Sequence, residues 1–588
     1  MLWLITPALG QIPGFGQQTE GVPFEVMIEG ELEDDLRARL EDVAGTVRGN
    51  RRPPRSLRVL RRRAESDMDT LDRALRAEGY YRGEVELRVE PPPEEGEPAQ
   101  VLFQVTPGPR YRLNQLAVRP DPPEPTYQAP SLESLGLVEG EPALTDTILS
   151  AEQQLLDQAL AAGHALAETG QLEAVVDHRT RAMDVTLVIA PGPKAALAMP
   201  AFTGTDGVDD DYLADLVPWE PGDTYTPDLI QEFRTRLIDT QLFSTVRITP
   251  GQELDDDGLL AISVDATQRR HRTIGAGVRF RSDEGPGGTI FWEHRNLREG
   301  GERLRAEIDA SGIGFELGGQ FRKPQFLRAD QDLLANAQFE IADTDAFEST
   351  SIGAGVAVER QLQPGMTASL GVAYRATEIT QDGDTDTFGL LSLPARFAWD
   401  TSDNLLDPTD GFRLQVEGEP FVDTLGEGLT FGKIFTDYRH YTQISEAPWL
   451  VLATRFGVGS IFGEALEDIP ADELFFAGGG GSVRGIEFQF ASPLDEDDDP
   501  IGGRSILLGA VELRTRVTET IGFAAFVDAG SAFEESIPDF NEDIRVGAGL
   551  GFRYITPVGP LRVDVGVPVD RRSTDEAFQI YISLGQAF

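Results

Sequence analysis

The distribution of apolar and polar positions divides the chain into two parts near residue 268. Before this point, stretches with apolar residues at helical spacing alternate with short extended runs. After it, almost every run alternates apolar and polar residues with the period of two that is typical of half-buried strands. We therefore predict helices together with strands over residues 22–267 and strands almost alone over residues 268–588.

A pattern of one helix, a turn and two strands occurs three times in the amino-terminal part, at a spacing of about 80 residues. The copies contain "LDRALRAEGYYRGEVELRVE", "LLDQALAAGHALAETGQLEAVVD" and "FRTRLIDTQLFSTVRITPG". Helices that cover one face of a small sheet form an α+β module. We predict three such modules, over residues 22–109, 110–193 and 194–267.

The last twelve residues, "AFQIYISLGQAF", show the strand pattern of the second part most clearly. One face carries Gln579, Tyr581 and Ser583, and the other carries only apolar residues. These apolar residues are Phe578, Ile580, Ile582, Leu584 and Phe588. Because one face suits lipid and the other a polar lumen, the pattern predicts a membrane β-barrel. A soluble β-sandwich shows the same alternation, but its small polar residues would face bulk water over both sheets.

The length of this second part predicts the number of strands. About 320 residues, at roughly 20 residues for each strand with its turn, give about 16 antiparallel strands. An unclosed sheet of this size would expose costly edges. The predicted fold is therefore a series of α+β modules followed by an all-β transmembrane barrel over residues 268–588.

Composition narrows the classes of protein that remain. No window reaches the 18 consecutive apolar residues of a transmembrane helix, and the apolar start over residues 1–21 is predicted to be a leader or the remnant of a signal peptide. The chain has no cysteine, which excludes disulfides and thiolate metal sites. A formal net charge of -48 argues against nucleic acid as a partner, because phosphates would be repelled.

The stretch "GGGGSVRGIEFQF" places one arginine between glycines and an apolar run. Glycines allow a backbone to adopt positive φ and to approach a wall closely, although an ordinary mobile loop is equally glycine-rich. A phosphate-cradling loop is excluded, because no lysine follows at the required spacing. The loop glycines concerned are Gly478, Gly479, Gly480 and Gly481.

The segment "SVRGIEF" resembles the [VI]-R-G-[FY] signature of the BamA and TamA outer-membrane assembly family. Val483, Arg484 and Gly485 match this signature, and Ile486 stands in the place of the usual aromatic residue. The resemblance implies that the loop folds back into the barrel lumen and that the arginine docks on the inner wall.

A buried arginine needs an acidic partner, since an unpaired guanidinium in a dry interior is expensive. Strand alternation supplies two acids on the lumen side, Glu512 in "ILLGAVELRTRV" and Asp528 in "IGFAAFVDAGSAF". The planar fork of an arginine can bond two carboxylates at once. We therefore predict that Arg484 is held by Glu512 and Asp528.

The resemblance covers the whole chain after the predicted leader. The three repeats resemble POTRA domains, which are periplasmic modules, and "WDTSDNLLDPTDGFRL" and "FVDAGSAF" resemble the TamA branch. Three modules are the count of that branch, whereas BamA proteins carry five and two-partner secretion transporters carry two. The resemblance implies a Gram-negative outer-membrane protein that assembles autotransporters and other β-barrel clients. It also implies a contact between the first module and a TamB-like protein anchored in the inner membrane.

The same resemblance places the client's route at a lateral seam between the first and last barrel strands, here "HRTIGAGVRFR" and the terminal strand. A client strand could pair with the opened edge by β-augmentation. Glycines in these strands weaken pairing or mark tight curvature, and both interpretations stay open. The predicted seam residues are Gly275, Gly277, Gly585 and Phe588.

Other functions fit the sequence less well. A passive porin has no need of three periplasmic modules. An envelope hydrolase would need a nucleophile elbow or a zinc motif, but neither G-x-S-x-G nor H-E-x-x-H occurs, and the five histidines are scattered. The acidic run "DEDDDP" lacks the spacing of a calcium loop. We therefore expect no enzymatic activity, no cofactor and no metal site, and keep a BamA-type insertase and a two-partner secretion transporter as alternatives.

Overall fold

A computed structural model describes residues 21–48, 53–94, 97–381, 383–426, 428–540, 543–573 and 575–588. Apart from Gly21, the predicted leader lies outside these residues. Within the described ranges, no helix combines the length and the apolar character that crossing a membrane requires. The chain forms two compact units, one of which contains the barrel.

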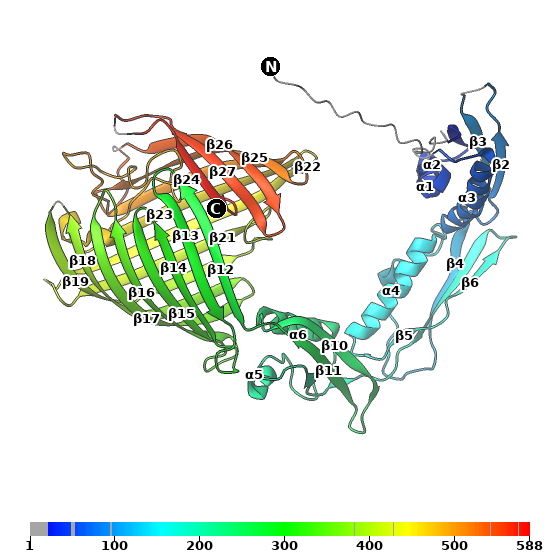
Figure 1. Cartoon of the computed structure of the whole chain (residues 1–588). Coiled ribbons are helices and arrows are strands. Elements are labelled where there is room, and N and C mark those ends of the chain that lie inside the picture. The colour runs from blue at the N-terminus through cyan, green and yellow to red at the C-terminus, as the bar shows by residue number, and fades with distance from the viewer. Residues whose placement is uncertain are drawn as a thin grey trace, which may run out of the picture. The chain divides into compact units, whose positions relative to one another are not determined.

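The first module is a three-stranded sheet covered by helices (Figure 1). Its elements are β1 Phe24–Glu29, α1 Asp34–Val43, α2 Gly45–Arg48, α3 Leu57–Ala77, β2 Glu84–Glu90 and β3 Ala99–Thr106. The buried face of α3, which includes Leu60, Leu71 and Leu75, shares one core with the buried residues of β3. The repeat pattern did not predict β1, which precedes the helices and pairs in parallel with β3.

The next two sheets continue the α+β pattern. The second contains β4 Arg112–Pro120, β5 Glu168–Thr169, β6 Glu173–Asp177 and β7 Ala182–Ala190, with η2 Glu133–Leu135 and α4 Thr145–Ala161. The third contains β8 Ala196–Leu197, β9 Ala201–Thr203, β10 Phe243–Leu254 and β11 Leu259–Gln268, with α5 Asp210–Asp215 and α6 Pro227–Asp239. In the second sheet, β4 is parallel to β7, so a crossover through α4 separates them.

The remaining strands close into a barrel (Figure 1). They are β12 Arg272–Arg281, β13 Gly285–His294, β14 Arg303–Ser311, β15 Gly314–Lys323, β16 Gln331–Asp343, β17 Glu348–Gln363, β18 Met366–Gln381, β19 Asp384–Ser392, β20 Ala395–Asp400, β21 Gly411–Asp423, β22 Thr430–Glu446, β23 Trp449–Phe462, β24 Ser505–Arg516, β25 Ile521–Phe533, β26 Arg545–Thr556, β27 Gly559–Pro568 and β28 Gln579–Leu584.

β19 and β20 form one interrupted strand, because both pair with β18 on one side and with β21 on the other. The interruption falls at Pro394, which has no N–H to donate to the ladder. Counted in this way, the barrel has 16 antiparallel strands. The predicted fold class, α+β modules followed by a 16-stranded barrel, is confirmed.

The terminal strand departs from its predicted pattern at one end. Phe578 and Leu584 are half exposed on the outside of the barrel, as the alternation predicts. Phe588 is buried inside the barrel instead, so its predicted place on the lipid-facing side is wrong. The reason is local: β28 ends at Leu584, and Gly585 adopts a φ of +91°, which turns the chain away from the strand direction.

Candidate functional site: the lumen loop and the seam

Residues 463–504 join β23 to β24 and are called the lumen loop below. Buried apolar residues of the loop, among them Val483 and Ile486, share one cluster with Ile506 and Leu508 of β24. The loop therefore folds into the barrel and packs against the inner wall. Ile486 is fully buried, so an aliphatic side chain fills the position that is aromatic in the family signature.

Arg484 reaches both acids that the sequence predicts. Its Nε and Nη2 donate to Asp528 at 2.7 and 2.9 Å, and its backbone N–H donates to Asp528 Oδ2 at 3.1 Å. Its Nη1 donates to Glu512 Oε2 at 2.6 Å. Its guanidinium also lies 3.6 Å from the centre of the Phe526 ring, which favours a cation. Only 2% of Arg484 is exposed.

A third acid, Asp564 on β27, completes the site. Its Oδ2 accepts from Arg484 Nη1 at 3.2 Å, and Asp564 is fully buried. The alternation in "LRVDVGVPVD" places this residue on the lumen side, so the sequence contains the signal. The pattern alone does not identify Asp564 as a partner of Arg484, because alternation fixes a face and not which strands lie within reach of the loop.

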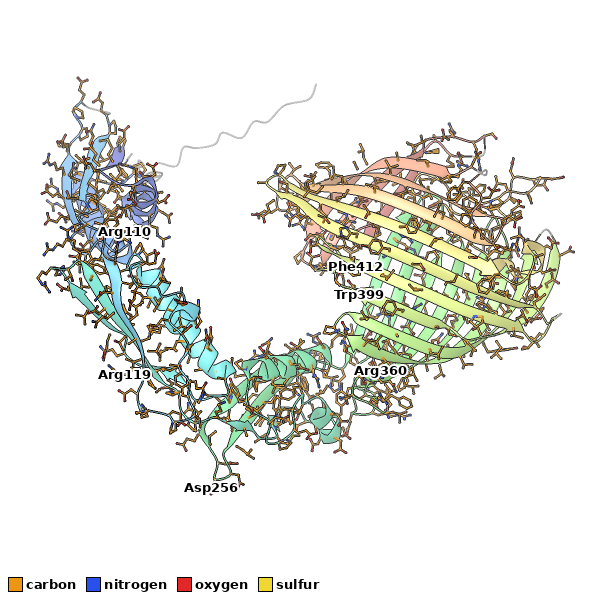
Figure 2. The ribbon with its side chains drawn as sticks, turned by 180° about the vertical axis from the view of Figure 1, so that it is seen from behind. Arg110, Arg119, Asp256, Arg360, Trp399 and Phe412 are labelled. Carbon is orange, nitrogen blue, oxygen red and sulfur yellow. The ribbon has the colours of Figure 1, made fainter. Side chains whose placement is uncertain are left out.

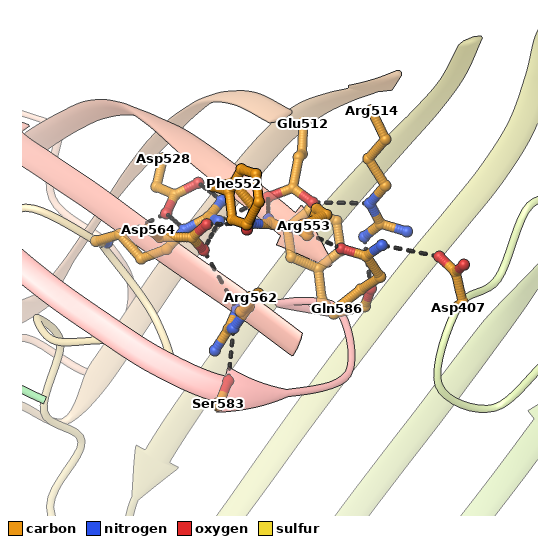
Figure 3. Close-up of polar contacts among 12 residues, drawn as sticks. Asp407, Glu512, Arg514, Asp528, Phe552, Arg553, Arg562, Asp564, Ser583 and Gln586 are labelled. Carbon is orange, nitrogen blue, oxygen red and sulfur yellow. Dashed lines mark hydrogen bonds and ion pairs between the residues drawn. The ribbon is translucent and has the colours of Figure 1, made fainter. Parts of the chain in front are cut away.

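Three further arginines surround these acids (Figure 3). Arg514 donates to Glu512 at 2.7 Å, Arg553 contacts Asp564 and Glu512, and Arg562 lies 3.6 Å from Asp564. All are at least nine-tenths buried. We call these seven side chains the charge cluster: Arg484, Glu512, Arg514, Asp528, Arg553, Arg562 and Asp564. Four cations against three carboxylates give near neutrality, which is what makes so many buried charges tolerable.

The loop glycines differ in what their positions demand. Gly478 and Gly479 have positive φ values of 115° and 83°, as predicted, whereas the expectation of positive φ at Gly480 and Gly481 is wrong. At Gly480 a Cβ atom would lie 2.9 Å from Tyr581, so close approach to the wall requires glycine there. A Cβ atom at Gly481 would meet nothing within 4 Å.

Gly485 combines both demands. Its φ is 95°, and a Cβ atom would lie 2.8 to 2.9 Å from backbone atoms of Val567 in the wall. Its N–H donates to the hydroxyl of Tyr581 on β28 at 3.0 Å. The residue after the arginine therefore holds the lumen loop against both of the last two strands.

The seam between β12 and β28 is the shortest junction in which either strand takes part. β12 pairs with β13 through ten residue pairs and β27 with β28 through six, but β12 and β28 share only Phe280–Ile582 and Arg281–Tyr581. Ser282 adds two hydrogen bonds to Ile580. Within the described ranges, no strand pairs with the seam-side edge of β12 from 272 to 279.

None of the four predicted seam residues lies in this short ladder. Gly275 and Gly277 belong to the part of β12 that pairs with β13 alone. Gly585 follows the end of β28 and donates to Pro560 on β27, and Phe588 lies in the lumen. The glycines thus flank the paired part of the seam and do not interrupt it.

The turn between β12 and β13 buries a carboxylate beside the lumen loop. Among the residues that the structure describes, neither carboxylate oxygen of Asp283 has a hydrogen-bond partner, and the neighbouring cation Arg281 is paired with Glu284. Burial raises the pKa of Asp283 to about 6. A Cβ atom at Gly479 would lie 3.2 Å from this carboxylate. Across the ranges that the structure describes, no three histidine, aspartate or glutamate residues are grouped so as to hold a metal ion.

Comparison with known proteins shows which family the chain resembles. The Omp85 superfamily domain matches residues 296–588, the POTRA domain described as TamA domain 1 matches residues 25–107, and a POTRA domain described as a surface antigen variable number repeat matches residues 201–267. Two sequence relatives are named outer membrane protein assembly factor BamA. One, from Nitratidesulfovibrio vulgaris, is 24% identical over 83% of this chain and 63% of its own length. The other, from Neisseria meningitidis, is 24% identical over 35% of this chain and 30% of its own length.

A solved structure shows the same fold. BamA from Haemophilus ducreyi lacking POTRA domains 1–3 superposes with a TM-score of 0.66 at 18% identity, over 81% of this chain and 100% of that one. The chain spans less than two thirds of the length of the curated relatives that it matches. The chain belongs to the Omp85 superfamily, with POTRA domains on the periplasmic side of a barrel in the outer membrane.

Proposed function

We propose that this protein is a TamA-type assembly and translocation factor, which helps autotransporters and other β-barrel proteins to insert through the seam between β12 and β28. The observation that carries the proposal is the length of the seam ladder, two residue pairs against ten on the other side of β12. Opening this junction breaks few hydrogen bonds, so it is the weakest line in the wall.

The unpaired edge of β12 supplies what a client strand needs. Backbone groups in a membrane must be paired, and an incoming strand satisfies its own groups by adding to such an edge. The client releases free energy as its strands pair and its apolar face enters lipid. The insertase therefore has to supply only a route, and no catalytic residue is needed.

The TamA assignment is supported by the first module and by the number of sheets before the barrel. Residues 25–107 match a POTRA domain of the TamA type, and three α+β sheets precede β12. A TamB-like protein in the inner membrane, contacting the first POTRA domain, is part of this proposal. A general BamA-type insertase and a two-partner secretion transporter are the alternatives.

Depletion of the protein separates these alternatives. A TamA-type factor predicts the loss of autotransporters and a subset of barrel proteins from the outer membrane, a BamA-type insertase predicts the loss of nearly all barrels, and a secretion transporter predicts the loss of one exported partner. Unchanged outer-membrane and secreted proteins would favour a passive channel and contradict the proposal.

A reversible lock tests the seam itself, because the chain contains no cysteine. Phe280→Cys with Ile582→Cys joins β12 to β28, whereas Val565→Cys with Ile580→Cys joins β27 to β28 as a matched control. We expect the first pair, when oxidised, to abolish client insertion into proteoliposomes and to recover after reduction. Normal insertion with the seam fully cross-linked would refute the lateral route.

A further inference from the structure

The last four residues, 585–588, leave the barrel wall and enter the lumen. Arg514 of the charge cluster donates to the carbonyl oxygen of Phe588 at 2.9 Å, and its guanidinium lies 5.7 Å from the centre of the Phe588 ring. The ring lies in a small buried cluster on the inner wall, with Tyr441, Ala453 and Ala510. We call residues 585–588 the tail. Specific contacts therefore hold the tail inside the barrel.

The turn 401–410 joins β20 to β21 at the periplasmic end of the barrel. At its base, the rings of Trp399 and Phe412 lie 4.8 Å apart on neighbouring strands (Figure 2). Within the turn, Asp403 accepts hydrogen bonds from the backbone of Thr409 and Asp410 at 2.8 and 3.2 Å. Side-chain bonds of this kind fix a turn in one conformation. We call this turn the strap.

The strap bonds directly to the tail. The backbone carbonyl of Leu406 accepts from the Gln586 N–H at 3.0 Å, and Asp407 Oδ1 accepts from Gln586 Nε2 at 2.8 Å. Asp407 Oδ2 accepts from Arg516 on β24 at 2.7 Å, which keeps the carboxylate in place. Figure 3 shows Gln586 between Asp407 and the charge cluster.

Gln586 uses both ends of its amide. Its Oε1 accepts from Arg553 Nε at 2.8 Å, while its Nε2 donates to Asp407. Arg553 also donates to Asp564, which accepts from Arg484 of the lumen loop. One hydrogen-bonded path thus runs from the lumen loop through the tail to the strap.

The order of strands makes this contact unusual. The strap follows the eighth strand of the barrel, and the tail follows the sixteenth, so half of the wall separates them in either direction. Pairing along the wall cannot bring them together. Their contact crosses the barrel mouth, and it ties the strand that closes the seam to the opposite side of the wall.

We propose that Gln586 is a positioning residue that holds the tail of β28 to the strap, and that β28 can leave β12 only after the bridge from Asp407 through Gln586 to Arg553 has broken. This inference rests on the lateral route proposed above and names the contacts that have to open. The lumen loop is linked to the same bridge, because Arg553 and Arg484 share Asp564.

Replacing the amide of Gln586 by a carboxylate tests the proposal in the whole chain. Gln586→Glu keeps an acceptor for Arg553 but places a carboxylate against Asp407, so we expect amide hydrogen exchange in peptides containing Phe280, Arg281 and Ile582 to accelerate about tenfold. Adding Asp407→Asn restores a donor opposite the new carboxylate and should return the exchange toward the wild-type rate. Ser583→Ala is the control, because it removes the hydrogen bond that Arg562 of β27 donates to β28 and leaves the strap untouched.

Any one of these results would overturn the inference: unchanged seam exchange in Gln586→Glu, no recovery in the double variant, or equal acceleration in Ser583→Ala. Rapid exchange along the whole barrel would also overturn it, since the effect would then be general loss of stability. A loosened seam with an unchanged rate of client insertion would support the strap while contradicting the lateral route, so the two proposals can fail separately.

Discussion

Asp528 accepts three hydrogen bonds from Arg484, two from its guanidinium and one from its backbone N–H. A single carboxylate on β25 thus fixes both the side chain and the main chain of the lumen loop at one point. Because neither residue is more than 2% exposed, the pair has no water to replace a lost partner.

Replacing Arg484 should release the lumen loop. Arg484→Ala leaves three buried carboxylates with fewer cations, and we expect it to lower the free energy of unfolding by about 3–5 kcal/mol. Arg484→Lys should recover little, because a point charge cannot bond Asp528 in the forked geometry. The urea midpoint of heat-modifiable gel migration measures the effect. Arg396→Ala, which removes an ion pair with Glu417 that is largely exposed to water, should cost at most about 1 kcal/mol, and an equal cost for both variants would contradict the buried role of Arg484.

Asp564→Asn tests the acid that sequence reasoning did not assign. The change preserves size but leaves four arginines with two carboxylates, so we expect faster hydrogen exchange in loop residues 478–488 and a lower unfolding midpoint. Asp309→Asn, which removes a partner of Arg279 that is 26% exposed, is the control. Equal effects of the two variants on the loop would show that Asp564 is dispensable.

Two glycines of the same loop give a matched pair. Gly485→Ala forces a Cβ atom against the backbone of Val567 at an unfavourable positive φ, and we expect the loop to detach from the wall. Gly481→Ala adds a methyl group into open space and should be close to neutral. Protease sensitivity of the loop distinguishes them. Equal resistance of both variants would contradict the observed packing.

The raised pKa of Asp283, in the turn between β12 and β13, should make the stability of the protein depend on pH. Its pKa in the folded protein is about 6, whereas an unfolded aspartate titrates near 4. Between these values the folded state binds more protons, so this group makes the protein less stable as pH rises from about 4 to 6. We expect Asp283→Asn to match the wild type near pH 4 and to be more stable at pH 7.5. Asp497 is an exposed loop carboxylate, so Asp497→Asn should leave the pH dependence of stability unchanged. Equal stability of Asp283→Asn and the wild type at pH 7.5 would contradict the burial of the Asp283 carboxylate.

The alternation of apolar and polar residues along the strands predicts which barrel side chains face the lumen and which face outward. It places Val511 and Val527 outside and Glu512 and Asp528 inside, since successive side chains must face opposite sides of a sheet. The glycine-flanked Arg484 then identifies which inward acids have a partner. These inferences need only the local chain and the cost of an unpaired buried charge.

The alternation pattern does not predict contacts between segments that are distant in the sequence. Alternation places Asp564 inside but cannot say that β27 lies next to the loop. A single positive φ at Gly485 or Gly585 redirects the chain, and neighbouring residues do not reveal it. The contact of Gln586 with the strap depends on the closed barrel, which brings the eighth and sixteenth strands to facing positions.

The most direct measurement of the lateral route is site-specific photo-cross-linking to a client during insertion. A cross-linking residue in place of Ile274, in the part of β12 that pairs with β13 but not with β28, is compared with one in place of Ile352, on β17 in the middle of the wall. Both isoleucines face outward, with 77% and 62% exposure. We expect a client adduct at position 274 and none at 352. Equal adducts at both positions, or none at 274 while insertion proceeds, would contradict insertion through the seam.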